Sequence, residues 1–243
     1  MSTILLVDDN EDIREIFTIF LSTEGHTIHS APGGRQCLEM LSTLRPDLIL
    51  LDIMMPGMDG WETLCAIKKN QSMQHLPVTM CSGKLPDLEE INRYGKYIED
   101  YLVKPQELST LSDSLVSIIQ RCINRRREME CLKNETPEHL LIDEFYDCTK
   151  KLYILEKFSR FFTADLEKAE VAIQHHKARM YEIRENLNHP VLSRGLEPQP
   201  SISPMHDNAV FSIEPGMREP EAAPENLTKW TQHEDPTGLQ NER

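Results

Sequence analysis

The sequence lacks an excess of positive charge and any long apolar run. Its 243 residues hold 26 Lys and Arg against 40 Asp and Glu, which gives a formal net charge of −14. This charge balance argues against non-specific binding over a large surface to nucleic acid or to an anionic membrane. No stretch reaches the roughly 20 apolar residues of a membrane span, and the start MSTILLVDDN is not typical of a signal peptide. We therefore expect a cytoplasmic protein without membrane insertion.

A paired-cysteine motif is also missing. The six cysteines are scattered and no two of them form a C-x-x-C pair. This pattern argues against a zinc site or a disulfide framework and predicts reduced thiols in the core.

The first half of the chain alternates short β-type runs with amphipathic helical patterns. Such alternation predicts βαβ units, and hence a parallel sheet with helices on both faces. Asn10 is a candidate cap for the first helix. The predicted strands are Ile4–Val7, Thr27–Ser30, Leu48–Leu51, Val78–Cys81 and Tyr101–Val103, and the predicted helices are 11–24, 33–44, 59–70, 87–94 and 107–122.

Residues 136–188 are predicted to be helical, with Thr136 as the N-cap and Pro137 at the first helical position. Apolar residues follow a 4-3 spacing from Leu141 to Leu187, which favours pairing with a second copy as a coiled coil. Thr163 is a possible second N-cap, so a helical hairpin and docking on a partner stay open as alternatives.

The last segment, 190–243, is acidic and rich in proline. Residues 189–243 hold 8 of the 15 prolines and carry four basic and nine acidic residues, a charge of −5. Such a segment buries too little apolar surface to offset its ordering entropy, and we expect it to be disordered.

Polar residues stand where the predicted strands end. Asp8 and Asp9 follow the first strand, Asp52 the third, Ser82 the fourth and Lys104 the fifth. Each has an ordinary explanation as a cap or a turn residue. However, the carboxyl ends of parallel strands meet at one rim of a sheet, where open α/β folds place their function. We therefore expect these groups to share one site.

Four stretches then show a family resemblance. ILLVDDN, LDIMMPGMDG, LPVTMCSGK and YLVKP resemble the receiver domain of two-component response regulators. The resemblance implies a flavodoxin-like, doubly wound five-stranded sheet of order 2-1-3-4-5 over residues 1–124. A helical or coiled-coil output or dimerisation segment would follow at 125–189. YGKYIEDYLVKP is similar to receivers of archaeal methanogens.

The resemblance also implies roles for individual residues. Asp52 would be the phospho-acceptor, Ser82 the switch hydroxyl, Tyr101 the aromatic switch residue and Lys104 the conserved-type lysine. Mg²⁺ suits such a carboxylate cluster. The implied metal ligands are Asp8, Asp9, Asp52 and the backbone carbonyl of Met54.

The implied function is a signalling protein rather than an enzyme. It would accept a phosphoryl group from a sensor histidine kinase and act on a downstream protein or on a second copy of itself. Two alternatives stay open, a transcription regulator with an atypical helical DNA-binding unit and a phosphorelay intermediate. The basic cluster at 125–127 and the pair His175-His176 are interpreted as ordinary surface or seam residues.

One position departs from the family pattern. The family usually has a glycine four residues before the tyrosine of DYLVKP, whereas this chain has Tyr97 there and Gly95 two residues earlier. The surface near the fourth helix, which is the usual signalling face, is therefore expected to be shaped unusually.

Overall fold

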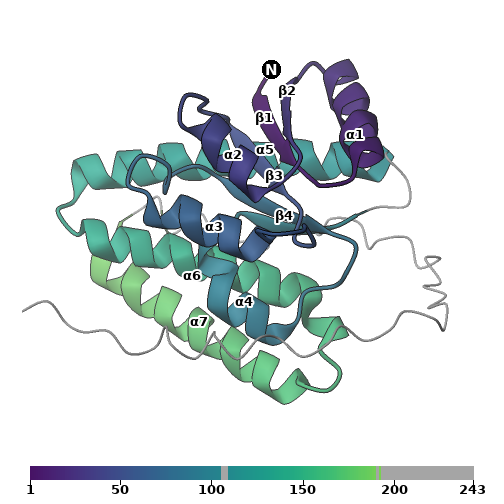
Figure 1. Ribbon diagram of the computed structural model, residues 1–243. Coiled ribbons are helices and arrows are strands. Elements are labelled where there is room, and N and C mark those ends of the chain that lie inside the picture. The colour runs from purple at the N-terminus through teal and green to yellow at the C-terminus, as the bar shows by residue number, and fades with distance from the viewer. Residues whose placement is uncertain (105–108, 190–191, 193–243) are drawn as a thin grey trace, which may run out of the picture. The chain divides into compact units, whose positions relative to one another are not determined.

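A computed structural model describes residues 1–104, 109–189 and 192 of the chain. A five-stranded parallel sheet of order β2-β1-β3-β4-β5 carries helices on both faces (Figure 1), as the sequence predicts. The strands are β1 Thr3–Val7, β2 Thr27–Ala31, β3 Leu48–Leu51, β4 Val78–Ser82 and β5 Asp100–Val103. The helices of this part are α1 Glu11–Thr23, α2 Gly34–Leu41, α3 Gly60–Lys69, α4 Leu88–Tyr94, the short 3-10 turn η1 Gly95–Tyr97 and α5 Ser109–Glu135.

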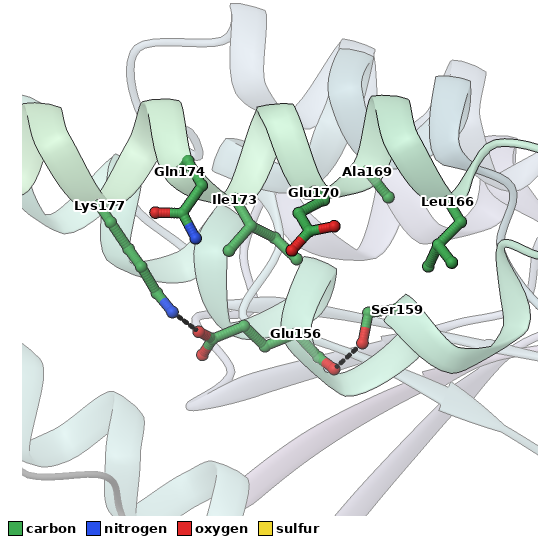
Figure 2. Close-up of a pocket in the computed structure, with 8 residues that line it drawn as sticks. All are labelled: Glu156, Ser159, Leu166, Ala169, Glu170, Ile173, Gln174 and Lys177. Carbon is green, nitrogen blue, oxygen red and sulfur yellow. Dashed lines mark hydrogen bonds and ion pairs between the residues drawn. The ribbon is translucent and has the colours of Figure 1, made fainter.

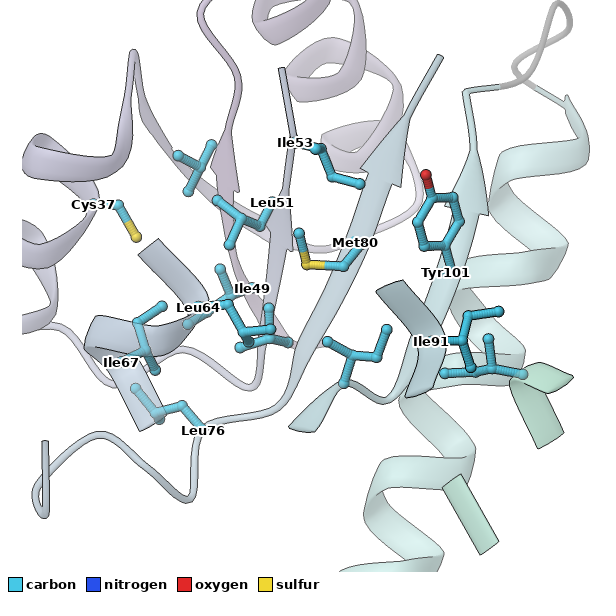
Figure 3. Close-up of a cluster of buried hydrophobic side chains, with 14 of the residues drawn as sticks. Cys37, Ile49, Leu51, Ile53, Leu64, Ile67, Leu76, Met80, Ile91 and Tyr101 are labelled. Atoms are coloured by element: carbon cyan, nitrogen blue, oxygen red, sulfur yellow. The ribbon is translucent and has the colours of Figure 1, made fainter. Parts of the chain in front are cut away.

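Alternating side chains of the strands build two apolar layers. One layer joins the sheet to α1 and α5, with Phe17 and Leu115 among its members. The other joins the opposite face of the sheet to α2, α3 and α4 (Figure 3), and Leu64 and Tyr101 belong to it. All four residues of β3 are fully buried, because a central parallel strand is covered on both faces.

Of the two N-caps that the sequence predicts for the helices discussed here, one is confirmed and one is wrong. Asn10 caps α1 by accepting a hydrogen bond from the backbone N–H of Ile13. The prediction that Thr136 starts the next helix is wrong. Its backbone N–H and its hydroxyl both donate to the carbonyl of Leu132, so Thr136 closes the end of α5. Helix α5 runs on past residue 124 to Glu135.

Residues 136–188 form a helical hairpin and not one continuous helix. Helix α6, His139–Phe158, is followed by the 3-10 turn η2, Ser159–Phe161, and by α7, Leu166–Leu187. The chain turns back at η2, and Thr163 does not cap α7, because Asp165 holds the N-cap position. The hairpin alternative is therefore the one that the structure adopts.

Most of the apolar 4-3 seam is buried within this single chain, whereas Leu166 is 54% exposed. Phe145, Leu152, Met180 and Ile183 pack together between α5, α6 and α7. A shallow groove remains where the end of α6 meets the start of α7 (Figure 2), and Lys177 pairs with Glu156 at 2.7 Å beside it. Most of the seam side chains thus have partners within the chain, and pairing with a second copy stays a prediction.

Other sequence predictions have mixed outcomes. All six cysteines are unpaired. Among the described residues, no helix is both long enough and apolar enough to cross a membrane. The predicted disordered tail, 190–243, lies outside the described residues except for Leu192.

Candidate functional site

The predicted rim residues do come together at the carboxyl ends of the strands. One carboxylate oxygen each from Asp8, Asp9 and Asp52 lies within 4.8 Å of the others. Asp8 and Asp52 are only 2% and 3% exposed, whereas Asp9 is exposed to solvent. The site is thus a buried carboxylate pair with a third carboxylate at its mouth.

Backbone hydrogen bonds between strands fix the two buried acids. The backbone N–H of Asp52 donates to the carbonyl of Val7 at 2.8 Å, and that of Asp8 donates to the carbonyl of Ala31 at 3.2 Å. Arg14 from α1 donates to the carbonyls of Asp8 and Asp9 at 2.8 and 3.0 Å. The acidic pair is therefore held by its main chain, and Oδ1 of Asp8 also accepts a hydrogen bond from the backbone N–H of Asn10 at 3.0 Å.

Lys104 bridges the buried carboxylates. Its Nζ lies 2.7 Å from Oδ2 of Asp8 and 3.0 Å from Oδ1 of Asp52. Burial lowers the pKa of Lys104, but the hydrogen bonds and charges of the two acids outweigh burial, so that its net pKa is raised. Lys104 is therefore a firmly protonated cation at the centre of the site.

Asp52 is harder to ionise than a surface aspartate. Burial raises its pKa more than the attraction of Lys104 lowers it, and the neighbouring charge of Asp8 adds to the increase. One lysine does not fully offset two buried carboxylates. A further cation at this place would favour the ionised form of Asp52.

The loop after Asp52 has its shape because of two glycines. Gly57 has a φ of +80°, in the left-handed region that favours glycine. A Cβ on Gly60 would stand 2.2 Å from the carbonyl oxygen of Asp52, so only glycine fits there. Asp59 then caps α3 by accepting from the N–H of Glu62. Met54, whose carbonyl is the predicted ligand, is exposed on this loop.

Ser82 and Tyr101 lie side by side behind the rim. Ser82 is fully buried at the end of β4, and its Oγ is 3.4 Å from the backbone nitrogen of Lys84. The ring of Tyr101 is also fully buried, and its hydroxyl donates to the carbonyl of Lys84 at 2.9 Å. All of the predicted site residues thus gather at one end of the sheet.

Sequence reasoning missed a polar link next to Lys84. Glu90 of α4 accepts hydrogen bonds from Lys84 Nζ at 2.7 Å and from Trp61 Nε1 at 3.1 Å. The spacing of Asp87 and Glu90 shows a capping box in the sequence, and the structure contains it. The contacts with Lys84 and Trp61 depend on the packing of α3 against α4, which no local pattern shows.

Comparison with known proteins agrees with this geometry. Residues 4–116 match the family model described as the response regulator receiver domain. The chain is 31% identical over 143 residues to the transcriptional regulatory protein AfsQ1 of Streptomyces coelicolor, a match that covers 59% of this chain and 60% of AfsQ1. It is 30% identical over 118 residues to the sensor histidine kinase TmoS of Ectopseudomonas mendocina, covering 47% of this chain and 12% of TmoS.

A solved structure is also similar. The N-terminal domain of a response regulator receiver protein from Methanoculleus marisnigri JR1 is 44% identical, with a TM-score of 0.43, and the match covers 47% of this chain and 94% of that domain. The matches to AfsQ1 and TmoS span less than two thirds of either protein's length.

Proposed function

Residues 4–116 belong to the response regulator receiver domain family, and from this premise we propose that Asp52 accepts a phosphoryl group from a sensor histidine kinase. The observation that carries the proposal is the bridging of Asp8 and Asp52 by Lys104 in a buried carboxylate site. An aspartate needs fixed positive charge beside it to approach a phosphoryl group, which is itself an anion.

The donor set fits Mg²⁺. Three carboxylates within 4.8 Å of one another offer hard oxygen ligands to a cation that prefers oxygen. We propose that Asp9 and Asp52 would hold the ion through carboxylate oxygens and Met54 through its carbonyl, with Asp8 acting mainly through water. When bound, the ion would supply the positive charge that the buried carboxylates and a phosphoryl group require.

The side chains of this site then have distinct tasks. An oxygen of Asp52 forms a bond to phosphorus, while the bond from phosphorus to the donor imidazole nitrogen breaks and that nitrogen keeps the electron pair. Lys104 would neutralise charge on the oxygens of the transferring group. Ser82 would donate its hydroxyl hydrogen to one of these oxygens afterwards. Tyr101, the second switch residue, would change its position together with Ser82.

We propose a cytoplasmic signalling protein that acts through contacts with other proteins and is not itself an enzyme. Residues 130–188 contain 9 basic and 12 acidic residues, a charge of −3, which suits a protein partner better than DNA. AfsQ1 is named a transcriptional regulator, so DNA binding is the second candidate. A gel shift at low salt separates the two, because DNA-binding proteins show non-specific affinity there.

The central test is phosphorylation of the full chain. In Mg²⁺ the protein should take up label from acetyl phosphate or from a phosphorylated kinase, and Asp52→Asn should abolish the uptake. Asp12→Asn is the matched control, because Asp12 is an exposed carboxylate on α1. Normal labelling of Asp52→Asn would show that the assignment is wrong.

A further inference from the structure

Helix α6 covers the receiver next to Tyr101. Ile154, Leu155 and Phe158 belong to the same apolar cluster as Tyr101 and Ile91 of the receiver. The rings of Phe158 and Tyr101 meet edge to face, with their centroids 5.6 Å apart and their planes at 78°. Phe158 is 4% exposed. The buried position of Tyr101 is thus closed from outside by a residue that does not belong to the receiver.

Helix α6 also holds the backbone of Tyr101. Lys157 Nζ donates to the carbonyl of Tyr101 at 3.1 Å and to Oδ1 of Asp100 at 2.7 Å. The hydroxyl of Tyr153 donates to Oδ2 of Asp100 at 3.2 Å. Asp100 is 1% exposed, so the accepting carboxylate of these bonds is shielded from water. Both the ring and the main chain of Tyr101 are therefore restrained by α6.

The other end of Tyr101 reaches the phosphoryl site. Its hydroxyl donates to the carbonyl of Lys84, two residues after Ser82. Burial raises the pKa of this hydroxyl well above its usual range, and a hydrogen bond with Ser82 acts in the opposite direction. The side chain of Tyr101 thus reaches the loop after Ser82 at one end and contacts α6 at the other.

We infer that Phe158 and Lys157 are positioning residues for Tyr101, and that docking of the α6–α7 hairpin is coupled to binding of a phosphoryl group at Asp52. The inference rests on the proposed function of Asp52. Tyr101 cannot leave its buried position without separating from Phe158, so the docked hairpin keeps residues 82–84 and Tyr101 ordered. A phosphoryl group then binds a site that is already arranged, which raises its apparent affinity. By reciprocity, the bound group stabilises the docked hairpin.

Beryllofluoride with Mg²⁺, a mimic of the phosphoryl group, tests this on the full chain. Phe158→Ala should weaken beryllofluoride binding at least about fivefold, at the low end of typical couplings. Phe145→Ala is the matched control. Phe145 lies on the same helix and is also 4% exposed, but it packs in the separate cluster between α5, α6 and α7. Because Phe145 does not contact Tyr101, its loss should weaken the affinity less than the loss of Phe158 does.

A double-mutant cycle shows whether the effect passes through Tyr101. In a Tyr101→Ala background, Phe158→Ala should cause no further loss of affinity. Beryllofluoride should also slow amide hydrogen exchange in α6 of the unsubstituted protein. If Phe158→Ala does not fold, Lys157→Met is the second variant, because it removes the bonds to the Tyr101 carbonyl and to Asp100 and leaves the apolar contacts in place.

The possible outcomes separate the two proposals. Selective weakening by Phe158→Ala or Lys157→Met supports the coupling. An unchanged affinity in these variants, or equal weakening by Phe145→Ala, overturns the coupling and leaves the proposed function intact. Failure of the unsubstituted protein to bind beryllofluoride overturns the proposed function, and the coupling with it.

Discussion

Lys151 of α6 passes Gly95 so closely that its Cγ lies 3.1 Å from where a Cβ on Gly95 would stand. The Nζ of Lys151 also donates to the carbonyl of Asn92, at the end of α4. Gly95 is the glycine that departs from the usual family position. The structure gives this departure a physical reason, because a bare backbone at residue 95 lets α6 approach the receiver.

Enlarging residue 95 should weaken this contact. We expect Gly95→Val to lower the free energy of unfolding by about 1–3 kcal/mol, since a branched side chain would meet Lys151 and Ile91. Gly95→Ala should cost less, because one methyl group needs the flexible lysine to shift by only a few tenths of an ångström. Urea denaturation of both variants checks the order. Equal stability of Gly95→Val and the unsubstituted protein would show that α6 does not pack here.

Among the polar residues, Asp100 should contribute most to docking of the α6–α7 hairpin on the receiver. Its carboxylate accepts from Arg121 of α5 at 2.5 Å and from Lys157 of α6 at 2.7 Å. Asp100→Asn would leave two cations facing a buried neutral group, at a cost of about 3–5 kcal/mol. Glu99 is the matched control, because it pairs with Arg125 and Lys150 but is 13% exposed in its side chain. Glu99→Gln should lower the urea midpoint less, and the reverse order would contradict this account.

The sheet could be predicted from the sequence because each of its strands carries a local signal. All five predicted strands match the structure to within one residue at either end. The arrangement of residues 136–188 could not be predicted in the same way. A 4-3 apolar seam gains the same burial from a second copy, from a hairpin or from the receiver, and periodicity alone does not choose among them. The choice depends on surfaces such as Gly95 that are complementary only in three dimensions.

The candidate site likewise contains residues that could be predicted from the sequence and residues that could not. Asp8, Asp52 and Lys104 could be predicted because the carboxyl ends of parallel strands meet at one rim. Glu90 and Phe158 could not, since their contacts join elements far apart in the sequence. Phe158 lies 57 residues after Tyr101 and is not one of the 4-3 positions that start at Leu141, so no sequence pattern singled it out.

Mg²⁺ should stabilise the fold through Asp9. A ligand that binds only the native state at a concentration of 100 times its Kd adds about 2.7 kcal/mol to the free energy of unfolding. We expect thermal unfolding to move to higher temperature in excess Mg²⁺ and to return when EDTA removes the ion. Asp9→Ala should reduce this shift strongly, whereas Asp12→Ala, which removes an exposed carboxylate of α1, should not. A shift of the same size in both variants would place the ion elsewhere.

The stability of the hairpin should fall in mild acid because of His176. Burial, with the nearby charges of Lys151 and His175, lowers the pKa of His176 to about 4. Its Nδ1 has no hydrogen-bond partner among the described residues. The unfolded chain binds the proton near pH 6.5, so between pH 6.5 and 4 the unfolded state holds more protons than the native state. The contribution of neutral His176 to the free energy of unfolding is therefore fully present above pH 6.5 and is lost as the pH falls toward 4.

A substitution that removes the imidazole should remove this loss. We expect the free energy of unfolding to fall between pH 7.5 and 5 by about 1 kcal/mol less in His176→Leu than in the unsubstituted protein, a figure reduced for the partial exposure of the ring. His175→Leu is the control, because His175 is the adjacent residue and is exposed. Urea denaturation at the two pH values measures the difference. If all three proteins lose the same stability, His176 is not the group that titrates, and the acid sensitivity of the hairpin has another source.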